Sequence, residues 1–185
     1  LLSCNISEVF VVGLASILSD QLLITPLQIL FLNLITDVFP ALALGMGEGD
    51  SSYMTKPPRP FKEKILEKNH WIFIFSYGTL ITFIVLGIFA GTNFYLGFSL
   101  QKSITISFLT LGLTQVIHIF NLRNKNSLFF KNEITFNPHV WGALLLCLLV
   151  FVFVVQVPIL KETLQLTSIS PIEWLIVLTA SLSVL

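Results

Sequence analysis

The sequence predicts an all-α membrane protein, a polytopic bundle of about six transmembrane helices. Of its 185 residues, 55% are hydrophobic and only 11% are charged, whereas a soluble domain usually carries about 25% charged residues. Several apolar segments approach the ~20 residues that a helix needs to cross a bilayer. The formal net charge of zero argues against a nucleic-acid partner, and the composition indicates the lipid bilayer as the surroundings of the chain.

Six apolar spans define the expected helices, and together they make one membrane domain over residues 1–185. The chain opens directly in an apolar pattern without Met or a cleavage site, so its first span is not a signal peptide. Because the first and last spans are short for a crossing, we expect a piece of a longer polypeptide. The approximate spans are 1–18, 26–46, 71–91, 103–122, 140–157 and 172–185.

The loops between the spans differ in charge, and this difference predicts the orientation of the chain. Loops 47–70 and 123–139 hold eight of the ten Lys and Arg residues. By the positive-inside rule, these two loops are cytoplasmic. The first span then runs outward, and the sixth ends in the cytoplasm. Loop 19–25 is short, so we expect the first two spans to be antiparallel neighbours.

The second span carries the most informative polar residues. Asn33, Thr36 and Asp37 are three and four positions apart, so their oxygens share one face of a helix. Pro40 has no backbone N–H, and in a regular helix this frees the carbonyl of Thr36. An acid in the middle of an apolar span is costly and is by default a functional group. Carboxylate, amide, hydroxyl and carbonyl oxygens together suit a hard cation.

A second acid lies in the first span, where Asn5 and Glu8 are three residues apart and share a face. Glu8 can face Asp37 across the short connection, and neither span holds Lys or Arg. Two unpaired carboxylates would not both stay ionised. A shared divalent cation, or a proton in its place, resolves this repulsion, so we expect cation/proton exchange. The alternative is a pair of protonated acids that hydrogen-bond to neighbouring helices.

The fourth span carries a stripe of neutral polar side chains. Gln115, His118 and Asn121 follow one another at intervals of three residues, which places them on one helix face. Without a carboxylate this is a weaker ligand set, and hydrogen bonding between helices is its alternative role. Cys4 and Cys147 also lie in apolar spans, where we expect buried and inert thiols.

Four stretches of this chain resemble a known family of membrane proteins. They are residues 3–8 (SCNISE), 26–37 (PLQILFLNLITD), 40–45 (PALALG) and 54–59 (MTKPPR). These stretches are similar to the C-terminal membrane half of P-type cation-transporting ATPases, the group that contains the sarcoplasmic-reticulum-type calcium pumps. The resemblance covers the whole chain as the fifth to tenth membrane helices, and it is most specific over residues 5–59.

The resemblance implies that polar residues within the spans are ion ligands. In calcium pumps, the position of Asp37 bridges two ion sites. Gln115 falls where some calcium pumps have a Glu in the eighth helix, and this departure leaves open a single ion site or another cation. The implied ligands are Asn5 and Glu8 of the fifth helix, Asn33, Thr36 and Asp37 of the sixth helix, and Gln115 of the eighth.

The catalytic motifs of that family are absent from these 185 residues. The sequence has no Asp-Lys-Thr-Gly phosphorylation motif, no Thr-Gly-Glu motif and no Pro-Glu-Gly-Leu-like segment of the fourth helix. This chain therefore has no ATPase site of its own. The resemblance implies upstream partners, namely nucleotide-binding, phosphorylation and actuator domains and the first four membrane helices. ATP and Mg²⁺ would act only through those domains.

Our interpretation is the membrane transport half of an ATP-driven pump for a divalent cation, with calcium as the first choice and manganese as the second. Two alternatives stay open at this stage. One is a monovalent-cation pump of the same family, for Na⁺ or K⁺, and the ion that triggers phosphorylation discriminates it. The other is a free-standing, non-enzymatic ion-binding bundle, and the size of the natural polypeptide discriminates that.

Overall fold

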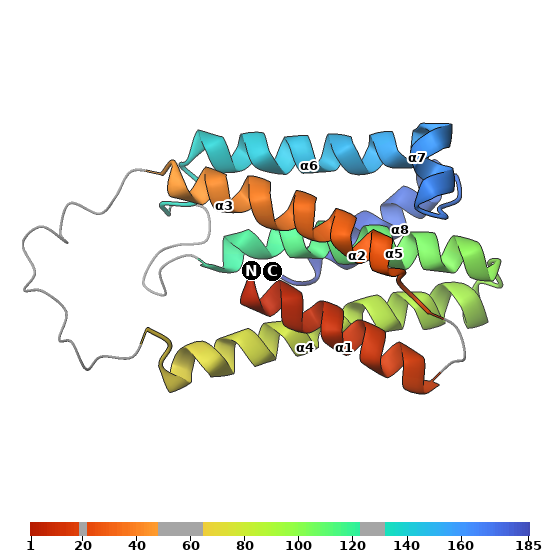
Figure 1. The fold of residues 1–185 in the computed structure, drawn as a ribbon, viewed down its shortest axis with the longest axis horizontal. Coiled ribbons are helices and arrows are strands. Elements are labelled where there is room, and N and C mark those ends of the chain that lie inside the picture. Colours follow the sequence, from red (N-terminus) through yellow and green to blue (C-terminus); the bar gives the residue numbers. More distant parts are fainter. Residues whose placement is uncertain (19–21, 48–64, 123–131) are drawn as a thin grey trace, which may run out of the picture.

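The computed structural model describes residues 1–18, 22–47, 65–122 and 132–185. Every regular element within these ranges is a helix, and the helices run along one common direction (Figure 1). The elements are α1 (Leu2–Leu18), α2 (Pro26–Leu32), η1 (Asn33–Asp37), α3 (Val38–Gly45), α4 (Lys68–Ala90), η3 (Gly91–Tyr95), α5 (Leu100–Ile117), η4 (His118–Leu122), α6 (Pro138–Gln156), α7 (Pro158–Thr163) and α8 (Pro171–Leu182).

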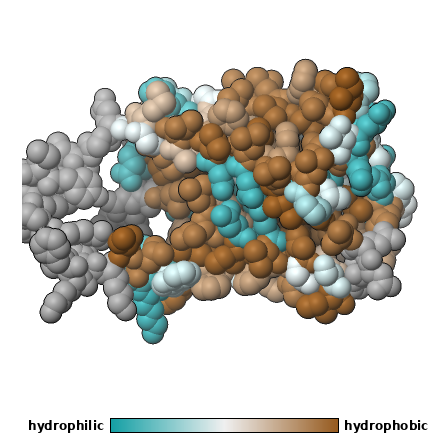
Figure 2. Space-filling view, in the orientation of Figure 1, coloured by the Kyte–Doolittle hydropathy of each residue, from teal (hydrophilic) through white to brown (hydrophobic). Residues whose placement is uncertain are grey.

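The predicted all-α membrane bundle is confirmed. Four helical segments are long and apolar enough to cross a membrane, and α1 and α8 are shorter apolar helices of 17 and 12 residues. The surface around them is largely hydrophobic (Figure 2), as expected for helices that face lipid. The chain is thus an integral, multi-pass membrane protein. The four long segments are Pro26–Gly45, Lys68–Tyr95, Leu100–Leu122 and Pro138–Gln156.

Successive spans alternate in direction, as their predicted order requires. Figure 1 shows the end of α3, the start of α4, the end of η4 and the start of α6 at the same end of the bundle. The described residues that flank the two basic loops therefore share one end. Most of the basic residues themselves, together with the stretch 54–59, lie outside the described residues. The cytoplasmic location of this end stays a prediction.

Helix α5 lies in the middle of the bundle, because α4, α6, α8 and η1 all pack against it. Every residue over 105–121 is buried. A helix that is surrounded by protein over most of its length can keep polar side chains away from lipid. This position explains why the polar stripe of the fourth span is tolerated at membrane depth.

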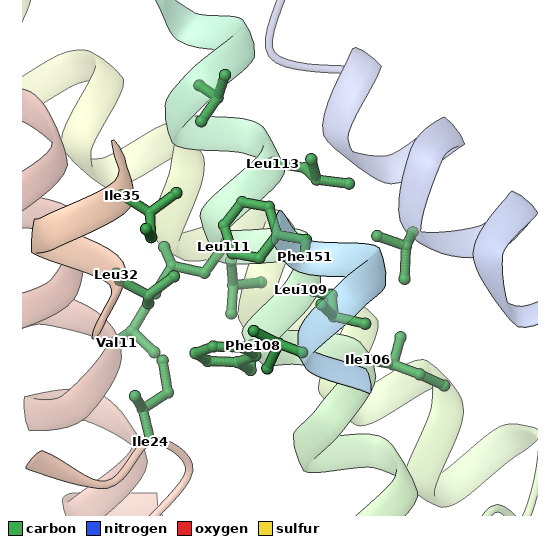
Figure 3. Packing of buried hydrophobic residues seen from close by; sticks show 14 of the residues in the cluster. Val11, Ile24, Leu32, Ile35, Ile106, Phe108, Leu109, Leu111, Leu113 and Phe151 are labelled. Carbon is green, nitrogen blue, oxygen red and sulfur yellow. The ribbon is translucent and has the colours of Figure 1, made fainter. Parts of the chain in front are cut away.

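The close packing around α5 depends on the missing side chain of Gly112. A Cβ atom there would lie 2.3 Å from Cζ of Phe151 and 2.9 Å from Cδ2 of Leu32. The Phe151 ring meets the rings of Phe31 and Phe108 edge-on, with 6.3 Å between centroids in both pairs. Helices α2, α5 and α6 are joined by this aromatic cluster, part of which is seen in Figure 3.

A second close approach fixes α1 against α4. A Cβ atom on Gly78 would lie 2.8 Å from Cγ2 of Ile6 and 3.3 Å from the carbonyl oxygen of Ser3. On the next turn, the Thr82 hydroxyl lies 2.7 Å from the carbonyl oxygen of Gly78 and 3.4 Å from that of Ser7. Small residues at such contacts let helix backbones approach within a membrane. This contact sets the position of α1 and of its polar face.

At the opposite end of the bundle, polar side chains anchor the segment between α7 and α8. The buried Gln28 donates to the carbonyl of Leu164 at 2.7 Å, and its side-chain oxygen accepts from the N–H of Thr25, which begins the second span. Lys102 of α5 pairs with Glu173 of α8 at 2.8 Å. The short helix α7, which precedes this segment, was not predicted from the sequence.

We expect Gly112→Ala to destabilise the protein by about 1–3 kcal/mol, because the new methyl group must displace the Phe151 ring and Leu32. Thermal unfolding of the detergent-solubilised protein measures the change. Gly142→Ala on α6 is the matched control, since nothing lies within 4 Å of a Cβ atom there. It should leave the stability unchanged or raise it by about 0.5–1 kcal/mol, the gain from removing a helical glycine. Equal melting temperatures for the two variants would contradict this packing.

Candidate ion-binding site

Polar side chains gather about halfway along the bundle, between α1 and the α2–η1–α3 helix. Figure 2 shows a hydrophilic group in the middle of a hydrophobic face at this place. Their position agrees with the predicted meeting of the first two spans. Polar groups at this depth need partners from the protein, because the bilayer core supplies none.

The second span departs from a regular helix at the predicted site. Residues Asn33–Asp37 form a π-helical turn, in which each carbonyl accepts from the N–H five residues on. The expectation of a regular helix is therefore corrected, whereas the freed Thr36 carbonyl stays a prediction. Pro40 cannot donate to Thr36 in the α register or to Ile35 in the π register. The thiol of Cys147 on α6 donates to the Ile35 carbonyl at 3.5 Å.

The carboxyl group of Glu8 is buried and is held by two amides. Glu8 is only 5% exposed, and Nε2 of Gln115 donates to its Oε1 at 3.0 Å. With its amide nitrogen turned to Glu8, Asn33 donates to Oε1 and Oε2 at 3.1 and 3.2 Å. This orientation of Asn33 is assigned from its hydrogen bonds, since the other would set oxygen against oxygen. One acid of α1 is thus bound by both η1 and α5.

Gln115 connects the elements of the site through both ends of its amide. Its Oε1 accepts from the hydroxyl of Thr36 at 3.0 Å, while its Nε2 donates to Glu8. The same nitrogen lies 3.4 Å from the carbonyl oxygen of Cys4 and 3.5 Å from Oγ of Ser7. Both Thr36 and Gln115 are buried. The predicted ligands from three spans therefore meet here.

Asp37 has an oxygen that the described residues leave without a partner. Its Oδ1 is buried and makes no hydrogen bond within the part of the chain that the structure describes. A buried carboxylate oxygen without a donor is rare and calls for an explanation, such as a bound ion or proton. Across the described ranges no group of three His, Cys, Asp or Glu residues could hold a metal, so a cation here would depend on neutral oxygens as well as on the two acids.

Asn5 is not brought to the centre of the site. It lies on α1 three residues before Glu8, but it is exposed where Glu8 is buried. Its side chain takes part in none of the hydrogen bonds that join Glu8, Thr36 and Gln115. Its role as an ion ligand stays a prediction.

The remaining polar residues of the stripe, His118 and Asn121, lie in η4 and contact other segments of the chain. The His118 ring lies against Tyr77 and Phe73 of α4, with 4.5 and 5.9 Å between ring centroids. Asn121 donates to the carbonyl of Val184 at 3.0 Å. Asn121 thus hydrogen-bonds to the residues that follow α8, and the expected hydrogen bonding between helices stays a prediction for it.

Sequence reasoning missed two participants, Ser7 and Cys147. Oγ of Ser7 lies 3.5 Å from Nε2 of Gln115. Its position next to Glu8 was the only sign in the sequence that it would lie at the site. Cys147 and Cys4 are confirmed as buried free thiols, but nothing in the sequence indicates that Cys147 meets the polar span. Pro40 was the single sign that the second span would be irregular.

Comparison with known proteins supports the same reading. A family model described as "Cation transporting ATPase, C-terminus" matches residues 21–185. A calcium-transporting ATPase of Bacillus subtilis is 33% identical over 187 residues, which cover 98% of this chain and 20% of that protein. The calcium-transporting ATPase 1 of Bacillus cereus is 30% identical over 196 residues, 98% of this chain and 22% of that protein. A P-type sodium-transporting ATPase4 of Toxoplasma gondii is 36% identical over 99 residues, 50% of this chain and 7% of that protein.

The chain spans about a fifth of the length of the two bacterial relatives. The matching family model covers all but the first 20 residues, and the apolar helices and polar motifs agree with it. The resemblance inferred from the motifs is confirmed. The chain therefore belongs to the cation-transporting P-type ATPases, whose C-terminal membrane region it matches.

Proposed function

We propose that this chain forms part of the ion pathway of an ATP-driven pump and that its cargo is calcium. The observation that carries the proposal is the buried Oδ1 of Asp37, which has no donor among the described residues. It belongs to a π turn whose other polar residues, Asn33 and Thr36, contact Glu8 and Gln115. A cation would supply the missing partner of this oxygen.

The available oxygens suit calcium, which takes 6–8 oxygen ligands in flexible geometry. In this proposal, Glu8 and Asp37 supply the negative charge. An amide binds a cation through its oxygen and donates through its nitrogen, so Asn33 would have to turn its amide in order to act as a ligand. The proposed neutral ligands are Asn5, Asn33, Thr36 and Gln115.

The choice of calcium is supported by the relatives that cover almost the whole chain. The two bacterial relatives carry calcium transport in their names and cover 98% of this chain, whereas the sodium-transporting relative covers 50%. Gln115 is a neutral amide at a position where an acid would add negative charge and favour a second divalent ion. Its presence therefore favours a single ion. We therefore favour one calcium ion at this site over a sodium or manganese pump.

The energy for transport would come from domains outside this chain. The phosphorylation motif of the family is absent from these residues, and the bacterial relatives are about five times longer. We propose that nucleotide-binding, phosphorylation and actuator domains and four further membrane helices act with this chain. ATP and Mg²⁺ would bind in those domains. Loops 47–70 and 123–139 would face them from the cytoplasmic end.

The natural polypeptide should be far larger than the 20.7 kDa of this chain, because the proposed pump needs those domains. An antibody against residues 47–70, used on native membranes, measures the size of the band. A band near ~20 kDa would favour the free-standing bundle instead and would move the ATP-driven steps to a partner chain.

Calcium should trigger phosphorylation of the complete pump by ATP, because two acids surrounded by neutral oxygens match a divalent ion better than a monovalent one. Phosphoenzyme formation is measured in membranes with calcium, manganese, sodium or potassium as the added ion. We expect calcium to act at the lowest concentration, with manganese next. Phosphorylation driven by sodium in the absence of calcium would contradict the proposal and support the monovalent alternative.

Asp37→Asn should raise the calcium concentration needed for half-maximal phosphorylation at least ~100-fold, because changes in the second shell of a metal site alone cost about 10–100-fold. The same assay on the complete pump measures this shift. Glu162→Gln on α7 is the control, since Glu162 is an exposed acid outside the site and should behave as the wild type. Normal calcium-dependent phosphoenzyme in Asp37→Asn would remove Asp37 from the site.

A further inference from the structure

We propose that Cys147 of α6 is a positioning residue for the ion site. Its buried thiol donates to the carbonyl of Ile35 and thereby holds the π turn Asn33–Asp37 in shape. The proposal rests on the proposed function in one respect, because it is this turn that carries three of the suggested cation ligands. The structural part of the proposal, a thiol that stabilises a π turn, can be tested without calcium.

In the π register, the carbonyl of Ile35 has no donor within its own helix. Its partner would be the N–H of residue 40, and that residue is Pro40, which has none. Ile35 is 6% exposed, so water is not at hand to replace the missing donor. Buried backbone carbonyls are almost always hydrogen-bonded. The Cys147 thiol, at 3.5 Å from this oxygen, is a donor that a neighbouring helix supplies.

Helix α6 is fixed in place at this contact. Cys147 is fully buried, and so is Phe151 one turn further along. The Phe151 ring lies over Gly112, where it shares the available space with Leu32. Figure 3 shows Leu32, Ile35 and Phe151 close together between α2 and α6. Helix α6 therefore contacts Leu32, the residue that precedes the π turn, and the Ile35 carbonyl within the turn.

The shape of the turn decides where the ligands lie. A π turn contains one residue more than an α turn, and each residue of an α-helix corresponds to about 100° of rotation. If the turn relaxed to an α-helix, the side chains on its two sides would rotate against each other by about that angle. Thr36 would then lose Gln115, and Asp37 would turn away from the position described above.

Two substitutions distinguish whether the Cys147 thiol acts as a hydrogen-bond donor or only fills space. Cys147→Ala removes the donor, whereas Cys147→Ser keeps a hydroxyl in its place, so the two variants differ by a single oxygen. In the complete pump, we expect Cys147→Ala to raise the calcium concentration for half-maximal phosphorylation about three- to tenfold, the usual effect of one hydrogen bond. The maximal phosphoenzyme level should stay unchanged. Cys147→Ser should stay within about twofold of the wild type.

Amide hydrogen exchange gives a readout that does not depend on calcium. Residues 33–39 should exchange faster in Cys147→Ala than in Cys147→Ser or the wild type, because the turn loses a bond to α6. Val154→Ala is the matched control, since Val154 is also buried on α6 two turns away. It should lower the melting temperature and change neither the exchange of residues 33–39 nor the calcium dependence.

The outcomes distinguish this proposal from the proposed function. Equal behaviour of Cys147→Ala and Cys147→Ser, or an equal effect of Val154→Ala, would overturn the role of the thiol. The predicted exchange pattern in a protein that is not phosphorylated in response to calcium would support the thiol's role and refute the calcium pump. If Cys147→Ala fails to reach the membrane, Cys147→Val fills the space without a donor and carries the same expectation.

Discussion

The buried carboxyl group of Glu8 is the constraint on which the centre of this bundle depends. An acid at membrane depth is costly unless protein groups donate to it. The donors are Asn33 of η1 and Gln115 of α5, so one acid of α1 is satisfied only when three elements meet. Gln115 adds Thr36 through its other end. The same contacts that make the acid tolerable also assemble the candidate ion site.

Apolar packing holds this polar centre from outside. In lipid, helices associate through close packing and small residues rather than through the hydrophobic effect. The close helix contacts at Gly78 and Gly112 are examples, since neither leaves room for a Cβ atom. Regular helices surround the site, while its ligand-bearing segment is a π turn. Such turns are frequent at functional sites. A rigid frame around one irregular segment suits the proposed ion site, which would have to bind an ion and release it.

The division of chemistry follows from what the chain contains. It offers two acids and several neutral oxygens at membrane depth, and it has none of the family's phosphorylation motifs. Its length is about a fifth of that of its bacterial relatives. In the proposed pump, ion binding in this segment and ATP chemistry elsewhere would be coupled through helix movement, and such a movement could change the register of the π turn.

The sequence by itself determined the apolar spans, their alternation and the depth of Glu8 and Asp37, because these depend on composition and spacing along one helix at a time. It also determined the family, through short motifs. Only the tertiary structure decided which polar groups meet. Asn5 shares a helix with Glu8 yet is exposed, and the thiol of Cys147 reaches the Ile35 carbonyl. The physical reason is that an α and a π register differ by one residue, which changes the side chains that face a neighbouring helix. Hydrogen bonds from neighbouring helices decide which of the two registers forms.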